Sequence, residues 1–338
     1  MTERKPWWPL FYLLPLLSLT GCSGWQSALD VHGQSAISLK HLIVLIVAVC
    51  SLIWALVMIA LIFALWRRRG DNALPFRRDP ARERRMTISV ASAVAVSVII
   101  IVVFTLASFT TTRALNVVGS DDFIIKIRGL QWWWDVEYPG SAPSERFQTA
   151  NEIHIPVGRN VRFQLEGIDV IHSFWVPSLA GKQDLIPGRP NELTIRAERP
   201  GVYRGQCAEF CGMQHAHMAL FVIADEPSVF EEWLRVQRAP VASSSDAEVL
   251  AGQRVFLSKP CAACHMIRGT AATGTTGPDL THVGGRKYIA AGLLETTRGS
   301  FAAWIADPQT LKPGNNMPMV PLNPEELRSI SAYLASLK

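Results

Sequence analysis

The longest hydrophobic runs of the chain lie in its first third. Residues 42–65 and 87–109 are almost wholly apolar, and a helix needs about 20 such residues to cross the hydrocarbon core of a bilayer. We therefore expect two transmembrane helices, at about residues 42–66 and 87–109. A buried core helix is the alternative, but runs of this length and purity are typical of membrane spans.

Between residues 122 and 221, short apolar and β-branched runs alternate with turn signals. Many short strands with regular turns indicate a β-sandwich or a Greek-key barrel, closed by a short helix at residues 228–237. The runs expected to form strands are Phe123–Ile127, Glu152–Pro156, Val161–Leu165, Glu192–Arg196 and Ala219–Ile223.

The pattern changes again after residue 238. Small and polar residues without periodicity at 239–246 predict a linker, and helical apolar spacing at 246–257, 301–305 and 324–337 predicts a small α-domain. The chain is thus expected to be a multidomain membrane protein. Its predicted parts are a signal peptide (1–21), an N-terminal segment with two membrane helices (22–112), an all-β domain (113–238), the linker, and an all-α domain (247–338).

The connection between the two membrane helices carries an excess of positive charge. Between residues 67 and 85 there are eight arginines and three acidic residues, a difference of +5 that equals the net charge of the whole chain. The basic balance therefore reflects this loop and not a nucleic-acid-binding surface. Short arginine-rich loops stay on the cytoplasmic side of the membrane, which predicts that both chain ends lie outside.

The N-terminus has the pattern of a secretory signal. Arg4 and Lys5 precede a short apolar run that is interrupted by prolines and is too brief to be a span. The run ends in Leu-Thr-Gly-Cys22, which resembles the bacterial lipobox. Cys22 is therefore a candidate for lipidation, with a plain signal peptide and a chance cysteine as the alternative.

The six cysteines are not expected to form a disulfide framework, although the predicted compartment is oxidising; a disulfide between Cys207 and Cys211 is the alternative for that pair. Cys22 lies in the lipobox and Cys50 inside the first span. The other four form two close pairs, Cys207 with Cys211 and Cys261 with Cys264, and each pair is surrounded by further residues that bind metals.

The first pair belongs to a dense set of soft donors. Two thiolates, an imidazole and a thioether favour copper over hard cations, whereas zinc, the nearest rival, prefers thiolate, imidazole and carboxylate. A second imidazole is available upstream, from His172. The donors in the loop are Cys207, Cys211, His215 and Met218.

The spacing Cys-x-Glu-x-Cys-x-x-x-His-x-x-Met, preceded by His172, resembles the binuclear copper (CuA) site of cytochrome c oxidase subunit II. The resemblance extends over Gln131–Tyr138, Lys182–Arg189 and the two predicted spans, from about residue 35 to 235. It implies a Greek-key cupredoxin domain in which two cysteine sulfurs bridge two coppers. The ligands that it implies are His172, Cys207, Glu209 through its carbonyl, Cys211, His215 and Met218.

The same resemblance implies two further roles. The carboxylate of Glu209 would be left free for a magnesium or manganese ion shared with the catalytic subunit. Trp132 would be the point where electrons enter the copper centre, although packing in a core is the alternative for this side chain.

The second cysteine pair is part of Cys261-Ala-Ala-Cys264-His265, a motif that attaches haem c through two thioethers and a histidine ligand. Downstream, Gly277-Pro278-Asp279-Leu280 and the loop around Met317 resemble the haem-supporting and methionine-ligand loops of class I cytochromes c. That family implies His265 and Met317 as axial ligands, with Met319 as the alternative to Met317.

Together these motifs predict subunit II of a caa-type cytochrome c oxidase with its own cytochrome c. Electrons would pass from an external cytochrome c or a quinol-cytochrome c reductase to the haem, then to copper, and then to subunit I, where oxygen is reduced to water and protons are translocated. Subunit III and membrane lipid are further expected partners, and nucleic acid is not. The expected location is the bacterial inner membrane, with the C-terminal domains on the periplasmic side.

Two alternatives stay open at this stage. The same copper module would suit an electron-transfer subunit of a nitric- or nitrous-oxide reductase. A copper-delivery or redox-sensing module is the other alternative, but it requires exchangeable copper, which a buried site with bridging thiolates does not readily provide.

Overall fold

A computed structural model of the chain describes residues 24, 26–67, 79–115, 122–140, 142 and 145–338. The predicted signal peptide, Cys22 and part of the arginine-rich connection lie outside the described residues. The chain divides into two compact units, residues 37–117 and the remainder (Met1–Ala36 with Val118–Lys338).

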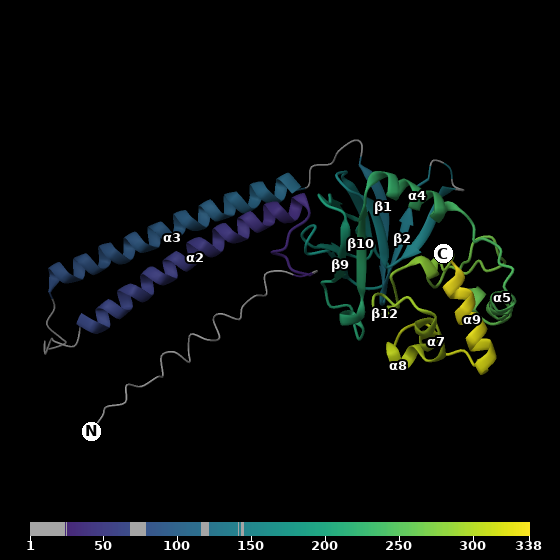
Figure 1. Cartoon of the computed structure of the whole chain (residues 1–338). Coiled ribbons are helices and arrows are strands. Elements are labelled where there is room, and N and C mark those ends of the chain that lie inside the picture. The colour runs from purple at the N-terminus through teal and green to yellow at the C-terminus, as the bar shows by residue number, and fades with distance from the viewer. Residues whose placement is uncertain (1–23, 25, 68–78, 116–121, 141, 143–144) are drawn as a thin grey trace, which may run out of the picture. The chain divides into compact units, whose positions relative to one another are not determined.

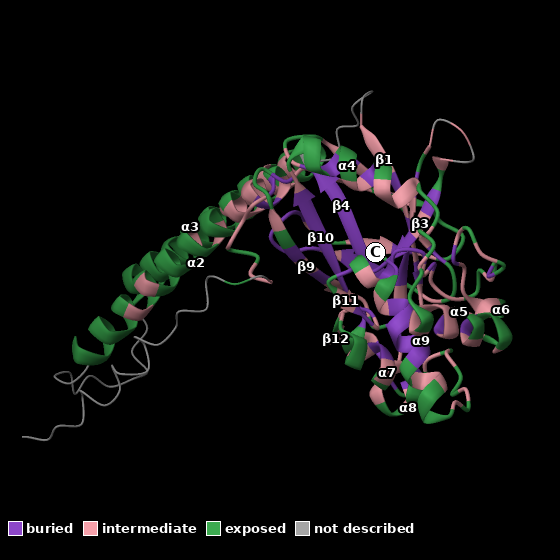
Figure 2. Ribbon diagram, turned by 45° about the vertical axis from the view of Figure 1, so that its right-hand side comes forward, coloured by how far each residue is buried: buried purple, intermediate pink, exposed green. Residues whose placement is uncertain are grey.

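The smaller unit is built from two long helices, α2 (Gln34–Arg67) and α3 (Pro80–Leu115), which run side by side (Figure 1). Each contains an 18-residue apolar window of which no residue is buried (Figure 2). Trp54 is 66% exposed and Ile99 is 62% exposed. Exposed apolar surface of this extent is typical of contact with a membrane or a partner, and both helices include the predicted spans.

The β-domain of the larger unit consists of two five-stranded sheets, with strand orders β3-β2-β1-β5-β8 and β4-β10-β9-β6-β7. The pairs β1–β5 and β4–β10 are parallel and the other pairs are antiparallel. The strands are β1 (Phe123–Leu130), β2 (Trp133–Tyr138), β3 (Phe147–Ala150), β4 (Glu152–Pro156), β5 (Val161–Gly167), β6 (His172–Trp175), β7 (Gln183–Leu185), β8 (Asn191–Ile195), β9 (Gly201–Cys207) and β10 (Ala219–Asp225).

The five predicted strands correspond to β1, β4, β5, β8 and β10, within two or three residues at their ends. The sequence did not predict β2, β3, β6, β7 and β9. These strands are short or contain glycine and polar residues, so their own pattern is weak, and pairing with neighbours in the sheet decides their conformation.

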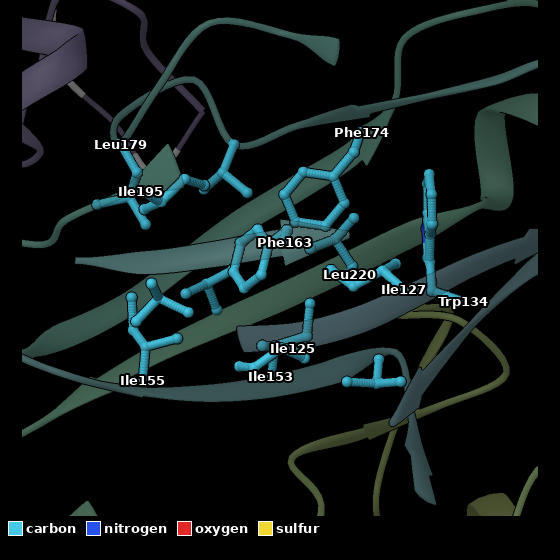
Figure 3. Packing of buried hydrophobic residues seen from close by; sticks show 14 of the residues in the cluster. Ile125, Ile127, Trp134, Ile153, Ile155, Phe163, Phe174, Leu179, Ile195 and Leu220 are labelled. Atoms are coloured by element: carbon cyan, nitrogen blue, oxygen red, sulfur yellow. The ribbon is translucent and has the colours of Figure 1, made fainter. Parts of the chain in front are cut away.

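The hydrophobic core of the β-domain lies between its two sheets (Figure 3). Residues of β1 and β5 alternate between buried and less buried positions, as the two-residue period of a strand requires. Ile125, Trp134, Phe163 and Phe174 are fully buried, and burial of one such side chain contributes roughly 1.5–3 kcal/mol. Helix α4 (Pro227–Arg238) adds Phe230 to this core.

The C-terminal domain is small and mostly helical. Helix α5 crosses α9 at Gly252, where an added Cβ would lie only 2.0 Å from the carbonyl oxygen of Ser329. Asp246, which the sequence assigned to the linker, is the N-cap of α5. The elements are α5 (Ala247–Ser258), α6 (Cys261–Cys264), η5 (Val283–Gly285), β11 (Tyr288–Ile289), β12 (Leu294–Glu295), α7 (Arg298–Ala306), α8 (Pro308–Leu311) and α9 (Pro324–Ser336).

The β-domain and the C-terminal domain lie in the same compact unit and make direct contacts. The backbone N–H of Lys287 donates to a carboxylate oxygen of Glu152 at 2.8 Å. The ring of Tyr288 stacks on that of Phe221, with centroids 4.3 Å apart. These contacts place the Cys-x-x-Cys-His motif and the two-cysteine loop within one continuous piece of structure.

Candidate copper and haem sites

The candidate copper ligands are brought together by the pairing of β6 with β9. In this antiparallel pair Phe174 lies opposite Cys207, so His172 at the start of β6 comes close to the cysteine at the end of β9. The loop after β9 then supplies Cys211, and the 3₁₀ helix η4 (His215–His217) supplies the second imidazole.

The donor atoms of this set converge. The sulfur of Cys207 lies 3.8 Å from that of Cys211 and 3.9 Å from Nδ1 of His172. Around Cys211, the Nδ1 atom of His215 is 3.6 Å away and the thioether sulfur of Met218 is 3.8 Å away. The carbonyl oxygen of Glu209 lies 3.2 Å from the sulfur of Cys207.

These separations fit donors around a common metal centre. Ligands held about 2.0–2.3 Å from one metal in tetrahedral geometry lie roughly 3.5 Å apart, close to the distances found here. His172, Cys207, Cys211 and Met218 are 0–3% exposed, so the donors are largely shielded from water. The set of sulfur and imidazole donors suits copper.

The two thiols are also electrostatically coupled. The hydrogen bond to Cys211 lowers the pKa of Cys207 to about 3, and the same contact raises the pKa of Cys211. Without a cation the pair therefore holds on to one proton, because two adjacent buried thiolates repel each other. A bound cation removes this repulsion and allows both sulfurs to act as ligands.

Trp132 lies between the candidate copper ligands and the C-terminal domain. Its indole N–H donates to the carbonyl oxygen of Cys211 at 2.9 Å, and the side chain of Gln131 donates to the same oxygen at 2.7 Å. Trp132 is only 9% exposed and lines a cavity of about 480 Å³ that also reaches Cys261 and His265.

That cavity has the features of a haem site. Its volume lies within the range of roughly 300–1,000 Å³ typical of cofactor pockets. Its walls include both cysteines of the Cys-x-x-Cys-His motif, the histidine and Met317. Met319, the alternative ligand, is 63% exposed.

The neighbourhood of His265 also fits haem ligation. Its Nδ1–H donates to the carbonyl oxygen of Pro278 at 2.8 Å, which orients the ring. Burial lowers the pKa of His265 and so favours the neutral form that binds iron. Gly277 lets the ring lie close to the backbone, since a Cβ there would be 2.6 Å from Cε1 of the imidazole.

Among the described residues, buried Arg286 of this cavity has a guanidinium Nε atom without a hydrogen-bond partner. A buried donor of this kind needs an acceptor. An anionic edge of a bound cofactor would supply one, so the residues present fit a haem with its carboxylates.

Two families of known proteins match this chain, one in the β-domain and one in the C-terminal domain. Residues 141–225 match the family described as "Cytochrome C oxidase subunit II, periplasmic domain", and residues 249–338 match the family described as "Cytochrome c". Cytochrome c oxidase subunit 2 of Alkalihalophilus pseudofirmus is 35% identical, with 99% of each chain covered. The chain belongs to the cytochrome c oxidase subunit II family.

Two further similar proteins are also second subunits of cytochrome oxidases. Cytochrome c oxidase subunit 2 of Bacillus subtilis is 28% identical over 98% of each chain. The solved periplasmic domain of subunit II of cytochrome oxidase from Bradyrhizobium japonicum is 34% identical and covers 36% of this chain and 97% of its own, with a TM-score of 0.34.

Membership of this family confirms the predicted function. The chain is the electron-transfer subunit of a haem-copper cytochrome c oxidase, with a C-terminal cytochrome c domain of its own. The predicted fold class is confirmed as well: two apolar helices, a β-sandwich and a small helical domain. The two matched families imply copper and haem as cofactors, a catalytic partner subunit, and attachment to a bacterial membrane.

The sequence reasoning missed one residue beside the copper candidates. The Nε2–H of His172 donates to Oδ1 of Asp169 at 2.8 Å, and the other carboxylate oxygen accepts from the backbone N–H of Gln131 at 2.7 Å. Asp169 thereby fixes which ring nitrogen of His172 faces the cysteines. The available signal was an acidic residue three positions before a candidate histidine ligand.

Proposed function

We propose that electrons enter this subunit at a haem c in the C-terminal domain and leave it through a binuclear copper centre toward oxidase subunit I. When bound, the haem and the copper pair supply reversible one-electron redox chemistry. The observation that carries this route is the position of Trp132, which lines the haem cavity and donates to the carbonyl of Cys211.

The protein's own residues prepare the copper end of this route. Cys207, Cys211, His172 and His215 would hold the two metals in the proposed site. Met218 and the carbonyl of Glu209 complete the set. Ligands from β6, β9 and the 3₁₀ helix η4 are held by a buried sheet, so little reorganisation is needed when the charge changes.

At the haem end, Cys261 and Cys264 would hold the haem covalently, and His265 and Met317 would bind its iron. The exposed position of Met319 favours Met317. Ligation by histidine and methionine raises the reduction potential of a haem.

We also propose a shared metal ion, partner proteins, a lipid anchor and an orientation in the membrane. We assign the half-buried carboxylate of Glu209 to a magnesium or manganese ion shared with subunit I. Subunit III is a further proposed partner, and an external cytochrome c or a quinol-cytochrome c reductase is the proposed electron donor. Cys22 is proposed to carry a lipid. Both C-terminal domains are proposed to lie on the periplasmic side. The positive-inside rule supports this orientation.

Spectroscopy and rapid kinetics of the purified oxidase test the proposal. We expect a mixed-valence copper signal in the EPR spectrum beside a low-spin c-type haem. After rapid mixing with a reduced soluble cytochrome c under anaerobic conditions, the haem should be reduced first and the copper second. Trp132→Phe should slow only the second step, because it removes the indole that bonds to Cys211.

Three results would contradict parts of the proposal. Copper that is reduced before the haem would reverse the direction of transfer. A complex that lacks either spectral signature would remove the corresponding cofactor. A Trp132→Phe variant with unchanged copper reduction and an intact copper spectrum would exclude the tryptophan route.

A further inference from the structure

The C-terminal domain carries the candidate haem ligands (the haem domain), and the β-domain carries the candidate copper ligands (the copper domain). One lysine of the haem domain lies inside the interface with the copper domain. Lys312 follows α8 and is only 3% exposed. Its ammonium group donates to the carbonyl oxygen of Trp132 at 2.7 Å and, more weakly, to that of Ala290 at 3.4 Å. Lysine is almost never buried so completely without a partner, so this placement points to a specific role.

The next two residues of the same loop also contact the copper domain. The side-chain amide of Gln214, next to His215, donates to the carbonyl oxygen of Pro313 at 2.8 Å. Gly314 has a φ of +81° and lies so close that an added Cβ would be 3.3 Å from the sulfur of Met213. Residues 312–314 therefore contact Trp132 and the loop that carries Met213 and Gln214 directly.

This contact joins loops that carry candidate ligands on both sides. Beyond Gly314 the chain continues to Met317, whose backbone N–H is held by the side chain of Asn315 at 2.8 Å. On the other side, Trp132 donates to the carbonyl of Cys211. Lys312 thus binds a residue of the copper domain that both lines the haem cavity and donates to Cys211.

The domains are connected through residues 239–246, and contacts between domains of one chain are commonly no stronger than transient protein–protein contacts. The docked arrangement therefore depends on a few specific bonds. Burial lowers the pKa of Lys312 to about 7; the neutral amine is a weaker donor than the ammonium group, but it still donates, so the contact persists in both forms.

We propose that Lys312 is a positioning residue that locks the haem domain onto Trp132 in the orientation that allows internal electron transfer, with Gln214 as its counterpart on the copper domain. The inference rests on the proposed function and deepens it. It assigns to one side chain the coupling between electron donor and acceptor within the chain.

The test uses the assembled oxidase carrying Lys312→Met, which keeps an unbranched apolar side chain one atom shorter and removes the donor. Reduction of the haem by a reduced soluble cytochrome c should keep its wild-type rate, and the spectra of both centres should be unchanged. Transfer from haem to copper should slow about tenfold, because loss of a hydrogen bond to a buried carbonyl shifts an equilibrium by roughly that factor. Arg254→Met, an exposed position on α5, removes the same charge and should leave both steps unchanged.

Wild-type transfer in Lys312→Met with intact spectra would overturn the inference, and so would equal slowing in Arg254→Met. If Lys312→Met fails to assemble, Gln214→Leu decides: slower haem-to-copper transfer with an intact copper spectrum supports the lock, and an unchanged rate overturns it. A wild-type complex without any haem-to-copper transfer would overturn the proposed function itself, and the inference with it.

Discussion

At the scale of single residues, the copper site depends on groups that are not ligands. Asp169 accepts from His172 and from the backbone of Gln131, whose side chain in turn donates to the carbonyl of Cys211. One carboxylate therefore connects the two ends of the donor set. Carboxylates that hold a histidine in this way tune both its orientation and its basicity.

Asp169→Asn should weaken copper binding. The amide keeps one acceptor but turns an NH₂ group toward a donor, so the ring of His172 loses its fixed orientation. We expect about a tenfold loss of metal affinity, in line with other outer partners of ligand histidines. Competition with a copper chelator measures it, and Glu166→Gln, a change in an exposed ion pair with Lys126, is the control. Equal copper retention in both variants would show that Asp169 does not support the site.

At the scale of elements, the haem domain depends on the close crossing of α5 and α9. Gly252 lies against the backbone of Ser329, and Phe256 meets Tyr333 edge-on, with ring centroids 6.0 Å apart. A residue larger than glycine does not fit at position 252, because backbone cannot move away from an added methyl group as a flexible side chain can.

Gly252→Ala should destabilise the haem domain despite the better helix propensity of alanine. The clash with the backbone of α9 should lower the free energy of unfolding by about 1–3 kcal/mol, which urea unfolding followed through the haem absorbance would detect. Gly299→Ala in α7 is the matched control, since its Cβ would meet only the side chain of Thr297 at 3.8 Å. A Gly252→Ala variant as stable as the control would contradict the close-crossing explanation.

At the scale of the whole molecule, a buried charged cluster lies where the β-domain meets the haem domain. His154 of β4 stands between Asp225 of β10, at 2.6 Å, and Glu152, at 3.3 Å. It stacks on Trp233 of α4. Glu152 also accepts from the backbone of Lys287 in the haem domain, so the cluster joins two strands of one sheet, a helix and the second domain.

This cluster should make stability depend on pH. Burial acts to lower the pKa of His154, but its hydrogen bonds to Asp225 and Glu152 outweigh burial and raise that pKa above the ordinary 6.5. The stabilisation is therefore fully present below pH 6.5 and is lost as the pH rises through the higher folded-state pKa, with a slope of at most about 1.4 kcal/mol per pH unit.

Urea unfolding of wild type and His154→Gln across this range measures the effect. The difference in stability between the two proteins should shrink as the pH rises above 6.5. A difference that stays constant with pH would mean that His154 is not charged in the folded protein. Subtracting the variant removes contributions from the other titrating groups that both proteins share.

The sequence by itself determined the features that depend on local pattern and on motif spacing. The two apolar runs predict the membrane helices because a span needs only length and hydrophobicity. The Cys-x-x-Cys-His motif and the two-cysteine loop identified both candidate sites, because their ligands lie close together in the chain. Five of the ten strands of the β-domain were also visible in the apolar pattern.

Only the tertiary structure decided which distant residues meet. The sequence implied that His172 meets Cys207 only through the family resemblance; the approach itself follows from the pairing of β6 with β9, and β6 has too weak a pattern to be predicted alone. The bond between Lys312 and Trp132 links positions 180 residues apart. Such contacts depend on strand order, register and domain docking, which are set by packing of the whole unit and leave no local signal in the sequence.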